Sequence, residues 1–281
     1  MPYFVGRERR NWLGRLGGNS GIGPCRAERL GERRSPFKVS VLVVTLAAFS
    51  LIIPAFNEAH RLGQTLTDVS RYLGEISPES ELIVVDDGST DATPEIAQDV
   101  FARDAFVRTR LIRQPQNRGK GAAVRAGLEA AAHPVALFSD ADLSTPITET
   151  PKLLEPIFAG EVDVAFGSRA LNRKLIGRRQ AWHREQGGRA FNLVVRMATG
   201  LPFWDTQCGF KAFQMHAFRS VLAQAQSDGF GFDVELLYLA RKANLRLREI
   251  PVHWDHNDGS KVVFLRDSVR MLQEIIALRM R

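Results

Sequence analysis

Residues 134–142 read Pro-Val-Ala-Leu-Phe-Ser-Asp-Ala-Asp, in which four consecutive apolar side chains lead almost directly into two carboxylates. An apolar run of this length predicts a buried strand, here from Pro134 to Phe138. In extended backbone, residues two apart point the same way, so Asp140 and Asp142 can face one ligand together. Two carboxylates, with water and phosphate oxygens completing the shell, suit Mg²⁺ or Mn²⁺. A solvated loop is the alternative interpretation.

The same alternation of apolar runs and helical patterns extends on both sides of this stretch. Leu62, Leu66, Val69 and Leu73 recur at helical spacing, and so do apolar residues near 96–100 and 123–128. Short strands between helices predict an α/β fold with a parallel sheet. The other strands are expected at Phe49–Ile53, Glu81–Val85, Arg108–Ile112 and Val162–Phe166.

Two of these strands lead into polar segments, Pro54-Ala-Phe-Asn57-Glu58 and Asp86-Asp87-Gly88-Ser-Thr-Asp91. In a parallel sheet, ligands bind at the carboxyl ends of the strands. Carboxylates there can accept hydrogen bonds from ribose hydroxyls and ring N–H groups. The alternative is a solvated turn before a capped helix, because Ser, Thr and Asp are favoured at helix starts.

A third segment, Asn117-Arg118-Gly-Lys120-Gly121-Ala, precedes a helical pattern. A helix start offers free backbone N–H groups to a diphosphate, and Arg118 and Lys120 add positive charge. The segment lacks the Gly-x-x-x-x-Gly-Lys-Ser/Thr spacing of a Walker motif.

The net charge of +7 is concentrated near the N-terminus. Residues 1–38 hold nine of the 38 Lys and Arg and three of the 31 acids, which leaves 29 and 28 for the remainder. The near-neutral remainder argues against a nucleic-acid partner. We expect 1–38 to be a disordered basic tail, or upstream sequence translated from a mis-assigned start, and 39–281 to form one domain.

An apolar stretch from Val39 to Ile53 follows the basic tail. It is shorter than the roughly 20 residues that a membrane span needs, and its end is the first predicted strand. Surface attachment to a membrane remains an option. The two cysteines, Cys25 and Cys208, form no CxxC pair, and Cys208 is expected to be a small buried thiol.

The order of these motifs resembles that of the family 2 glycosyltransferases of GT-A fold, over roughly residues 49–275. Four motifs in the second half resemble those of dolichyl-phosphate β-glucosyltransferases and their bacterial relatives: Gly167-Ser-Arg169, Asp205-Thr-Gln-Cys-Gly-Phe-Lys211, Phe232-Asp-Val-Glu-Leu-Leu237 and Gly259-Ser-Lys261. The resemblance implies inverting transfer of a hexose, glucose in this subfamily, from a UDP-sugar to a polyprenyl or dolichyl phosphate. It also implies peripheral contact with the cytoplasmic face of a membrane.

The resemblance assigns roles residue by residue. It implies that Asp140 and Asp142 serve the metal and catalysis, and that Arg169 is catalytic and binds the acceptor phosphate. The basic loop at 172–189 would assist, because Arg binds phosphate in a bidentate manner. The implied donor-binding residues are Pro54, Asn57, Glu58, Asp86, Asp87, Gly88, Lys120, Gly121 and Asp140, and the implied acceptor-binding arginines of the loop are Arg178, Arg179 and Arg184.

An acceptor phosphate is already an anion, so the reaction needs no strong general base. A hydroxyl acceptor would need one, and Asp233, Glu235 and Asp205 are the candidates. Asp233 is otherwise expected to bind sugar hydroxyls. GDP-mannose is a second candidate donor, and a sugar-nucleotide-binding protein without catalysis is a more distant interpretation. An apolar stripe in 261–281 predicts a helix that docks on its own domain or on a membrane surface. The stripe consists of Val262, Leu265, Val269, Leu272 and Ile276.

Overall fold

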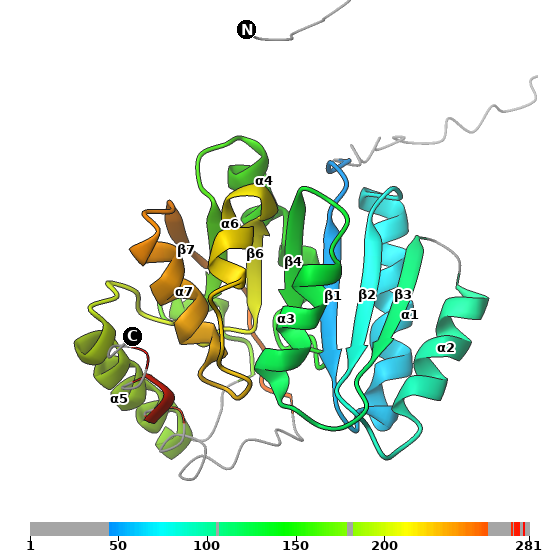
Figure 1. Ribbon diagram of the computed structural model, residues 1–281, viewed down its shortest axis with the longest axis horizontal. Coiled ribbons are helices and arrows are strands. Elements are labelled where there is room, and N and C mark those ends of the chain that lie inside the picture. The colour runs from blue at the N-terminus through cyan, green and yellow to red at the C-terminus, as the bar shows by residue number, and fades with distance from the viewer. Residues whose placement is uncertain are drawn as a thin grey trace, which may run out of the picture. The chain divides into compact units, whose positions relative to one another are not determined.

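Seven strands form one sheet in the computed structural model, which describes residues 45–104, 107–178, 182–257, 271, 273–275 and 278, without the side chains of 182–185 (Figure 1). The strand order is β3-β2-β1-β4-β6-β5-β7. The strands are β1 (Ser50–Ala55), β2 (Glu81–Asp86), β3 (Arg108–Arg113), β4 (Val135–Ser139), β5 (Val164–Ser168), β6 (Phe210–Gln214) and β7 (Leu247–Pro251).

The sheet is parallel except at β6, which runs antiparallel to both β4 and β5. The five predicted strands are confirmed, with ends shifted by one or two residues. Strands β6 and β7 were not predicted. Lys211 interrupts the apolar run of β6, and β7 is a half-exposed edge strand of mixed polarity, so neither has the pattern of a buried strand.

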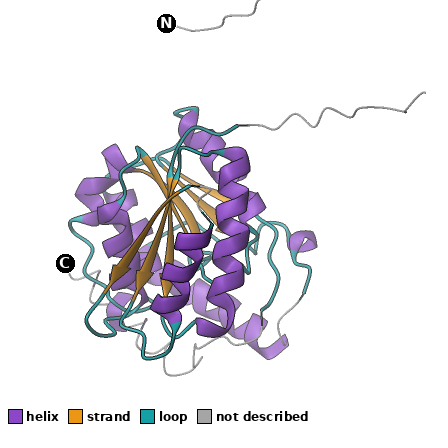
Figure 2. Ribbon diagram, turned by 90° about the vertical axis from the view of Figure 1, so that its right-hand side faces the viewer, coloured by secondary structure: helices purple, strands orange, loops and turns teal. Residues whose placement is uncertain are grey.

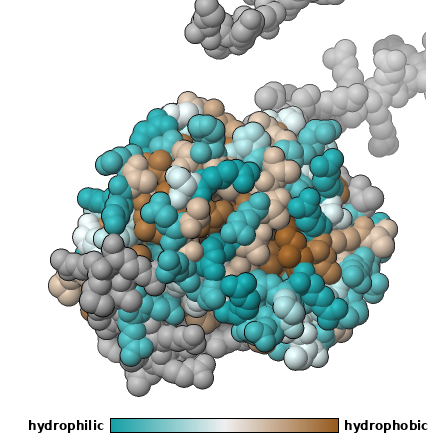
Figure 3. Space-filling model, viewed as in Figure 1, coloured by the Kyte–Doolittle hydropathy of each residue, from teal (hydrophilic) through white to brown (hydrophobic). Residues whose placement is uncertain are grey.

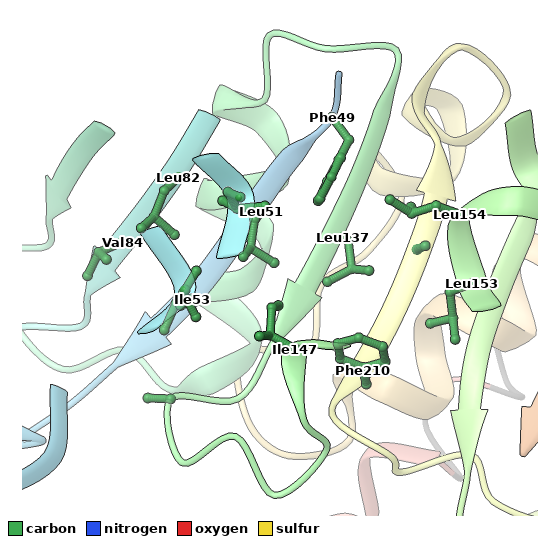
Figure 4. Close-up of a cluster of buried hydrophobic side chains, with 14 of the residues drawn as sticks. Phe49, Leu51, Ile53, Leu82, Val84, Leu137, Ile147, Leu153, Leu154 and Phe210 are labelled. Atoms are coloured by element: carbon green, nitrogen blue, oxygen red, sulfur yellow. The ribbon is translucent and has the colours of Figure 1, made fainter. Parts of the chain in front are cut away.

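Helices cover both faces of the sheet (Figure 2). Leu51 and Ile53 belong to one core with residues of α1, α2 and α4, whereas Ile52 belongs to a second core with residues of α3, α5, α6 and α7. Figure 4 shows Leu51, Ile53, Leu82, Leu137 and Phe210 on one side of the sheet. The helices are α1 (Ala59–Ile76), α2 (Thr93–Arg103), α3 (Lys120–Ala130), α4 (Thr150–Phe158), α5 (Trp182–Thr199), α6 (Met215–Leu222) and α7 (Phe232–Lys242).

Strands β1, β2 and β4 are rich in apolar residues, and both of their faces are buried. Successive side chains of a strand point to opposite faces, so the residues of β1 alternate between the two cores. The outer surface is different: polar side chains cover most of the face that carries α3, α6 and α7 (Figure 3).

The strand order reverses between β1 and β4. Strand β1 pairs with β2 along its whole length up to Ala55, but with β4 only from Ser50 to Ile52. Pro54 has no backbone N–H, and it lies beyond the last residue paired with β4, so no ladder bond is lost there. The crevice outside the carboxyl ends at such a reversal is where open α/β sheets bind ligands.

The predicted tail at 1–38 lies outside the described residues, as do 39–44, the Gly259-Ser-Lys261 motif and most of 261–281. Phe49 and the first part of β1 are buried in the sheet. Met271, Ile275 and Leu278 are also buried, whereas all residues of the predicted C-terminal stripe lie outside the described residues. Among the residues that the structure describes, no helix has the length and apolarity to cross a membrane.

Candidate functional site

The turn after β4 presents the two carboxylates. Leu143 has a φ of +46°, a left-handed conformation that is unusual for a side chain of this size. The backbone N–H of Leu143 donates to the carbonyl of Asp140 (3.2 Å), and that of Ser144 donates to Oδ1 of Asp142 (2.9 Å). This tight turn holds Asp140 and Asp142 at the carboxyl edge beside the reversal of strand order, and strained backbone of this kind clusters at functional sites.

Lys120, the first residue of α3, reaches the same turn. Its Nζ lies 2.6 Å from Oδ1 of Asp140. Burial opposes the charged form of Lys120, yet the carboxylates of Asp140 and Asp233 outweigh it and raise the pKa of the lysine. The charged form of Lys120 is therefore favoured next to Asp140.

Gly209 lies directly against the Asp140 carboxylate. Its carbonyl accepts the N–H of Asp140 (3.1 Å), and a Cβ at position 209 would come 2.1 Å from Oδ2 of Asp140. No side chain fits there without moving the carboxylate. Gly209 was not among the predicted site residues, because its role depends on β6 lying beside β4, and that contact is antiparallel and distant in sequence.

A buried ion pair lies next to these residues. Lys211 is fully buried, and its Nζ contacts both Oδ1 of Asp233 and the carbonyl of Cys208, each at 2.5 Å. Burial raises the pKa of Asp233, although Lys211 and Lys120 oppose this effect. The structure thus gives Asp233 a partner inside the protein, and that partner, Lys211, was not predicted.

The other two candidate bases also have protein partners. Oε2 of Glu235 accepts the backbone N–H groups of Gln226 and Ser227 (3.0 and 2.7 Å). Asp205 accepts a bidentate pair of bonds from Arg169, from Nε at 2.7 Å and from Nη2 at 2.8 Å. Both carboxylates are buried.

The ends of β1 and β2 form one network. Asn57, with a φ of +52°, accepts the N–H of Thr90 on its Oδ1 (2.8 Å), and Glu58 is ion-paired with Arg61 (2.7 Å). Gly88 has a φ of +71°, in the left-handed region that favours glycine. The two segments after β1 and β2 therefore form ordered turns that are hydrogen-bonded to each other.

Asp86 and Asp87 are both buried and bound to backbone. Oδ1 of Asp86 accepts the N–H of Ser89 (3.1 Å). The two oxygens of Asp87 accept the N–H groups of Arg118 and Gly119 (2.9 and 2.8 Å). Asp87 thus ties the segment before α3 to the end of β2, a structural role in addition to the predicted contact with a nucleoside.

The start of α3 differs from the expectation of free N–H groups. The backbone N–H groups of Gly121 and Ala122 donate to the carbonyl of Asp228 (2.8 and 3.3 Å). Arg125 also contacts the Asp228 carboxylate and the carbonyl of Ser227. The loop before α7 therefore covers the helix start, so the backbone N–H groups of Gly121 and Ala122 are not free for a phosphate.

Two of the expected acceptor residues, Arg169 and Arg178, lie in the described part of the chain, and both contact the segment 254–256. Burial opposes ionisation of Asp205, but Arg169 outweighs it and lowers the pKa of the carboxyl. Arg169 is thus engaged with Asp205 and lies over the Trp254 ring, 5.6 Å from its centroid. The backbone N–H of Arg178 donates to Oδ1 of Asp255 (2.7 Å). Arg179 and the side chain of Arg184 lie outside the described residues.

The segment after β7 reaches the turn that follows β4. The N–H of Asp255 donates to the carbonyl of Ser144 (2.8 Å), and Nδ2 of Asn257 donates to the carbonyl of Asp142 (2.6 Å). Sequence reasoning missed both residues, because no local pattern connects residue 257 with residue 142. Cys208 is buried as predicted, and burial raises the pKa of its thiol to about 11.

The side chains at this turn supply only some of the ligands that a hard divalent cation needs. Carboxylate oxygens of Asp140 and Asp142 are the ligands that Mg²⁺ and Mn²⁺ prefer. Within the described part of the chain, no group of three or more His, Cys, Asp or Glu side chains is arranged to hold a metal. The two carboxylates therefore fit a cation whose remaining ligands are water and ligand oxygens.

Comparisons with known proteins find relatives of this chain. The family profile "Glycosyl transferase family 2" matches residues 50–224. Dolichyl-phosphate beta-glucosyltransferase of Dictyostelium discoideum is 32% identical over 83% of this chain and 74% of its own length. The Saccharomyces cerevisiae protein of the same name is 34% identical over 82% and 74%.

A solved structure shows the same fold. Glucosyl-3-phosphoglycerate synthase of Mycobacterium tuberculosis, crystallised with Mn²⁺, UDP and glucosyl-3-phosphoglycerate, superposes with a TM-score of 0.59. The match covers 82% of this chain and 78% of that one, at 21% identity.

Proposed function

Because the chain belongs to the family 2 glycosyltransferases and has their GT-A fold, we propose that it transfers glucose from UDP-glucose to a polyprenyl phosphate, with inversion at the anomeric carbon. The observation that carries the proposal is the group formed by Asp140, Asp142 and Lys120 at the reversal of strand order. The names of the curated relatives support the polyprenyl-phosphate acceptor.

In this proposal the donor diphosphate lies next to Lys120. Its ammonium group is paired with Asp140 and is partly exposed at the carboxyl edge of the sheet, where a diphosphate can reach it. The nucleoside lies over the ends of β1 and β2, near Asn57, Glu58 and Asp86. When bound, a divalent cation at Asp140 and Asp142 would neutralise charge on the leaving diphosphate, as the Mn²⁺ and UDP of the mycobacterial structure suggest by analogy of fold.

The hydrogen bonds and ion pairs of the three candidate bases favour a phosphate acceptor over a hydroxyl acceptor. Asp233 is bound by Lys211, Asp205 by Arg169, and Glu235 by two backbone N–H groups. A general base must be within reach of the proton that it removes, and these three carboxylates are buried among their own partners. An acceptor that is already an anion needs no such base.

The reaction then balances without a proton transfer. An oxygen of the acceptor phosphate forms a bond to the anomeric carbon, and the bond from that carbon to the UDP oxygen breaks with its electron pair. Lys120 stabilises the charge that develops on the leaving diphosphate, and such preorganised groups contribute most where charge develops. Arg178, with Arg179 and Arg184, would receive the acceptor phosphate at the cytoplasmic face of a membrane.

The test is transfer of labelled glucose into a short polyprenyl phosphate. Purified protein is incubated with UDP-glucose, the acceptor and Mg²⁺ or Mn²⁺, with GDP-mannose in parallel and Asp142→Ala as control. Metal-dependent product from UDP-glucose that is absent in the variant supports donor, acceptor and reaction together. UDP-glucose binding without lipid product would refute the acceptor assignment and favour a hydroxyl acceptor or a non-catalytic binding protein.

A further inference from the structure

Helix α5 is apolar on two opposite sides. Val195 is fully buried in the core, where Phe191 and Ala198 also pack. On the other side, Leu193 is 54% exposed and Met197 is 67% exposed, with the exposed Val194 between them. Residues 193, 194 and 197 share one helix face, because positions three and four apart are neighbours. A soluble surface helix normally has a polar outer face. We therefore expect this stripe of exposed apolar side chains to contact a binding partner.

Trp204 extends the stripe beyond the helix. Its side chain is 57% exposed, and the guanidinium carbon of Arg196 lies 4.1 Å from the centre of a Trp204 ring. Nδ2 of Asn192, on α5, donates to the carbonyl of Trp204, which holds the tryptophan beside the helix. Trp and Arg both combine an apolar body with a polar end, and both are favoured at membrane–water interfaces.

The charge of this part of the sequence favours an anionic partner. From Arg173 to Trp204 the chain has seven Lys or Arg residues and a single acid, Glu185. Arg189 and Arg196 lie on α5 itself, and Arg189 is exposed. A symmetric contact with a second copy would bring these arginines toward their counterparts, which is unfavourable. An anionic lipid surface instead attracts them.

The position of α5 suits a lipid-linked acceptor. Oγ1 of Thr206 donates to Oδ1 of Asn192 (3.1 Å), and the preceding residue, Asp205, holds Arg169 just after β5. Figure 1 shows α5 near the end of the sheet toward which β1 and β4 point. A phosphate at a membrane surface beside α5 would thus be near the carboxyl edge that carries the candidate site.

We propose that the α5 stripe, formed by Leu193, Val194, Met197 and Trp204, docks on an anionic membrane surface, with Arg189 and Arg196 at the lipid headgroups. The inference rests on the proposed function only for the identity of the lipid substrate. Binding to the bilayer itself needs neither donor nor acceptor.

The experiment is co-sedimentation of the full chain with vesicles of phosphatidylcholine alone or mixed with phosphatidylglycerol. We expect binding to the anionic vesicles, at least about tenfold weaker for the double variant Leu193→Ser, Met197→Ser, because two apolar side chains are lost from the contact. Arg189→Gln with Arg196→Gln should weaken binding and reduce its dependence on salt. Phe158→Ser, which removes a 37%-exposed apolar side chain from α4, is the matched control and should bind like wild type.

Circular dichroism and the thermal midpoint check that each variant folds. Equal vesicle binding by wild type and the double variant would overturn the proposal. A dimer that the double variant converts to a monomer, with vesicle binding unchanged, would also overturn it and make a second copy the occupant. Vesicle binding through the α5 stripe without glucose transfer would support this inference and refute the proposed function. Glucose transfer to a soluble acceptor without vesicle binding would refute this inference and leave glucosyltransferase activity supported.

Discussion

Nζ of Lys120 lies 2.6 Å from Oδ1 of Asp140, so the start of α3 and the end of β4 are joined by an ion pair at the carboxyl edge of the sheet. Both side chains are partly exposed there. A nucleotide-sugar diphosphate that enters would compete with Asp140 for the ammonium group. The pair therefore holds a cation ready at the point where the proposed reaction develops negative charge.

Replacing Lys120 with Met should lower kcat/KM for glucose transfer by about 100-fold to 1,000-fold, the usual cost of removing one group that stabilises a developing anion. Lys120→Arg, which retains the charge, should lose less. Steady-state transfer assays measure both, and calorimetric titration with UDP-glucose separates binding from chemistry. Wild-type kcat/KM in Lys120→Met would exclude the proposed role.

Removal of divalent cations with EDTA should abolish transfer, and Mg²⁺ or Mn²⁺ should restore it. Asp142→Asn retains the oxygen that accepts the N–H of Ser144, so the turn should persist while one anionic ligand is lost. We expect the metal concentration for half-maximal activity to rise by at least about 100-fold. Activity of the variant that is independent of metal concentration would contradict this prediction.

Gly209→Ala should displace the Asp140 carboxylate, since the new Cβ would meet Oδ2 at 2.1 Å. A shift of about 1 Å in a catalytic group costs about 100-fold in rate, and we expect a loss of that order in kcat. Gly188→Ala on α5 is the matched control, because a Cβ there meets nothing within 4 Å. The prediction fails when the two alanine variants have the same kcat.

Lys211→Met should destabilise the fold by about 3–5 kcal/mol, because it leaves the Asp233 carboxylate buried without its cation. The double variant Lys211→Met, Asp233→Leu should recover part of that loss, since neither charge remains. Urea denaturation followed by circular dichroism gives the free energies of unfolding. A double variant that is less stable than Lys211→Met would show that the buried pair is not the cause.

The Arg169–Asp205 pair predicts a pH dependence of stability. The folded-state pKa of Asp205 is lowered below its unfolded value of about 3.9. The pair therefore stabilises the fold above that pH, and this contribution is lost as the pH falls through the folded-state pKa. The difference in free energy of unfolding between wild type and Arg169→Met should be largest near neutral pH and shrink below about pH 4. A pH-independent difference in urea denaturation would contradict the assignment.

Much of the molecule follows from local pattern. Apolar runs at β1, β2 and β4 are buried on both faces, and the polar segments after them lie at the carboxyl edge, as parallel strands require. The two cores also follow from the alternation of Leu51, Ile52 and Ile53. The spacing of Asp140 and Asp142 predicted a metal site, and the family resemblance added the expected donor and acceptor residues.

The remaining features of the candidate site depend on contacts between residues that are far apart in the sequence. The amino-acid sequence by itself established the alternation of strands and helices and the carboxylates at strand ends, because periodicity and chain order are local properties. Only the tertiary structure showed that Gly209 packs against Asp140, that Lys211 neutralises Asp233, and that the α5 stripe is exposed. These contacts arise from an antiparallel strand and a helix brought together by burial of the whole domain, and no spacing along the chain encodes which side chains then meet.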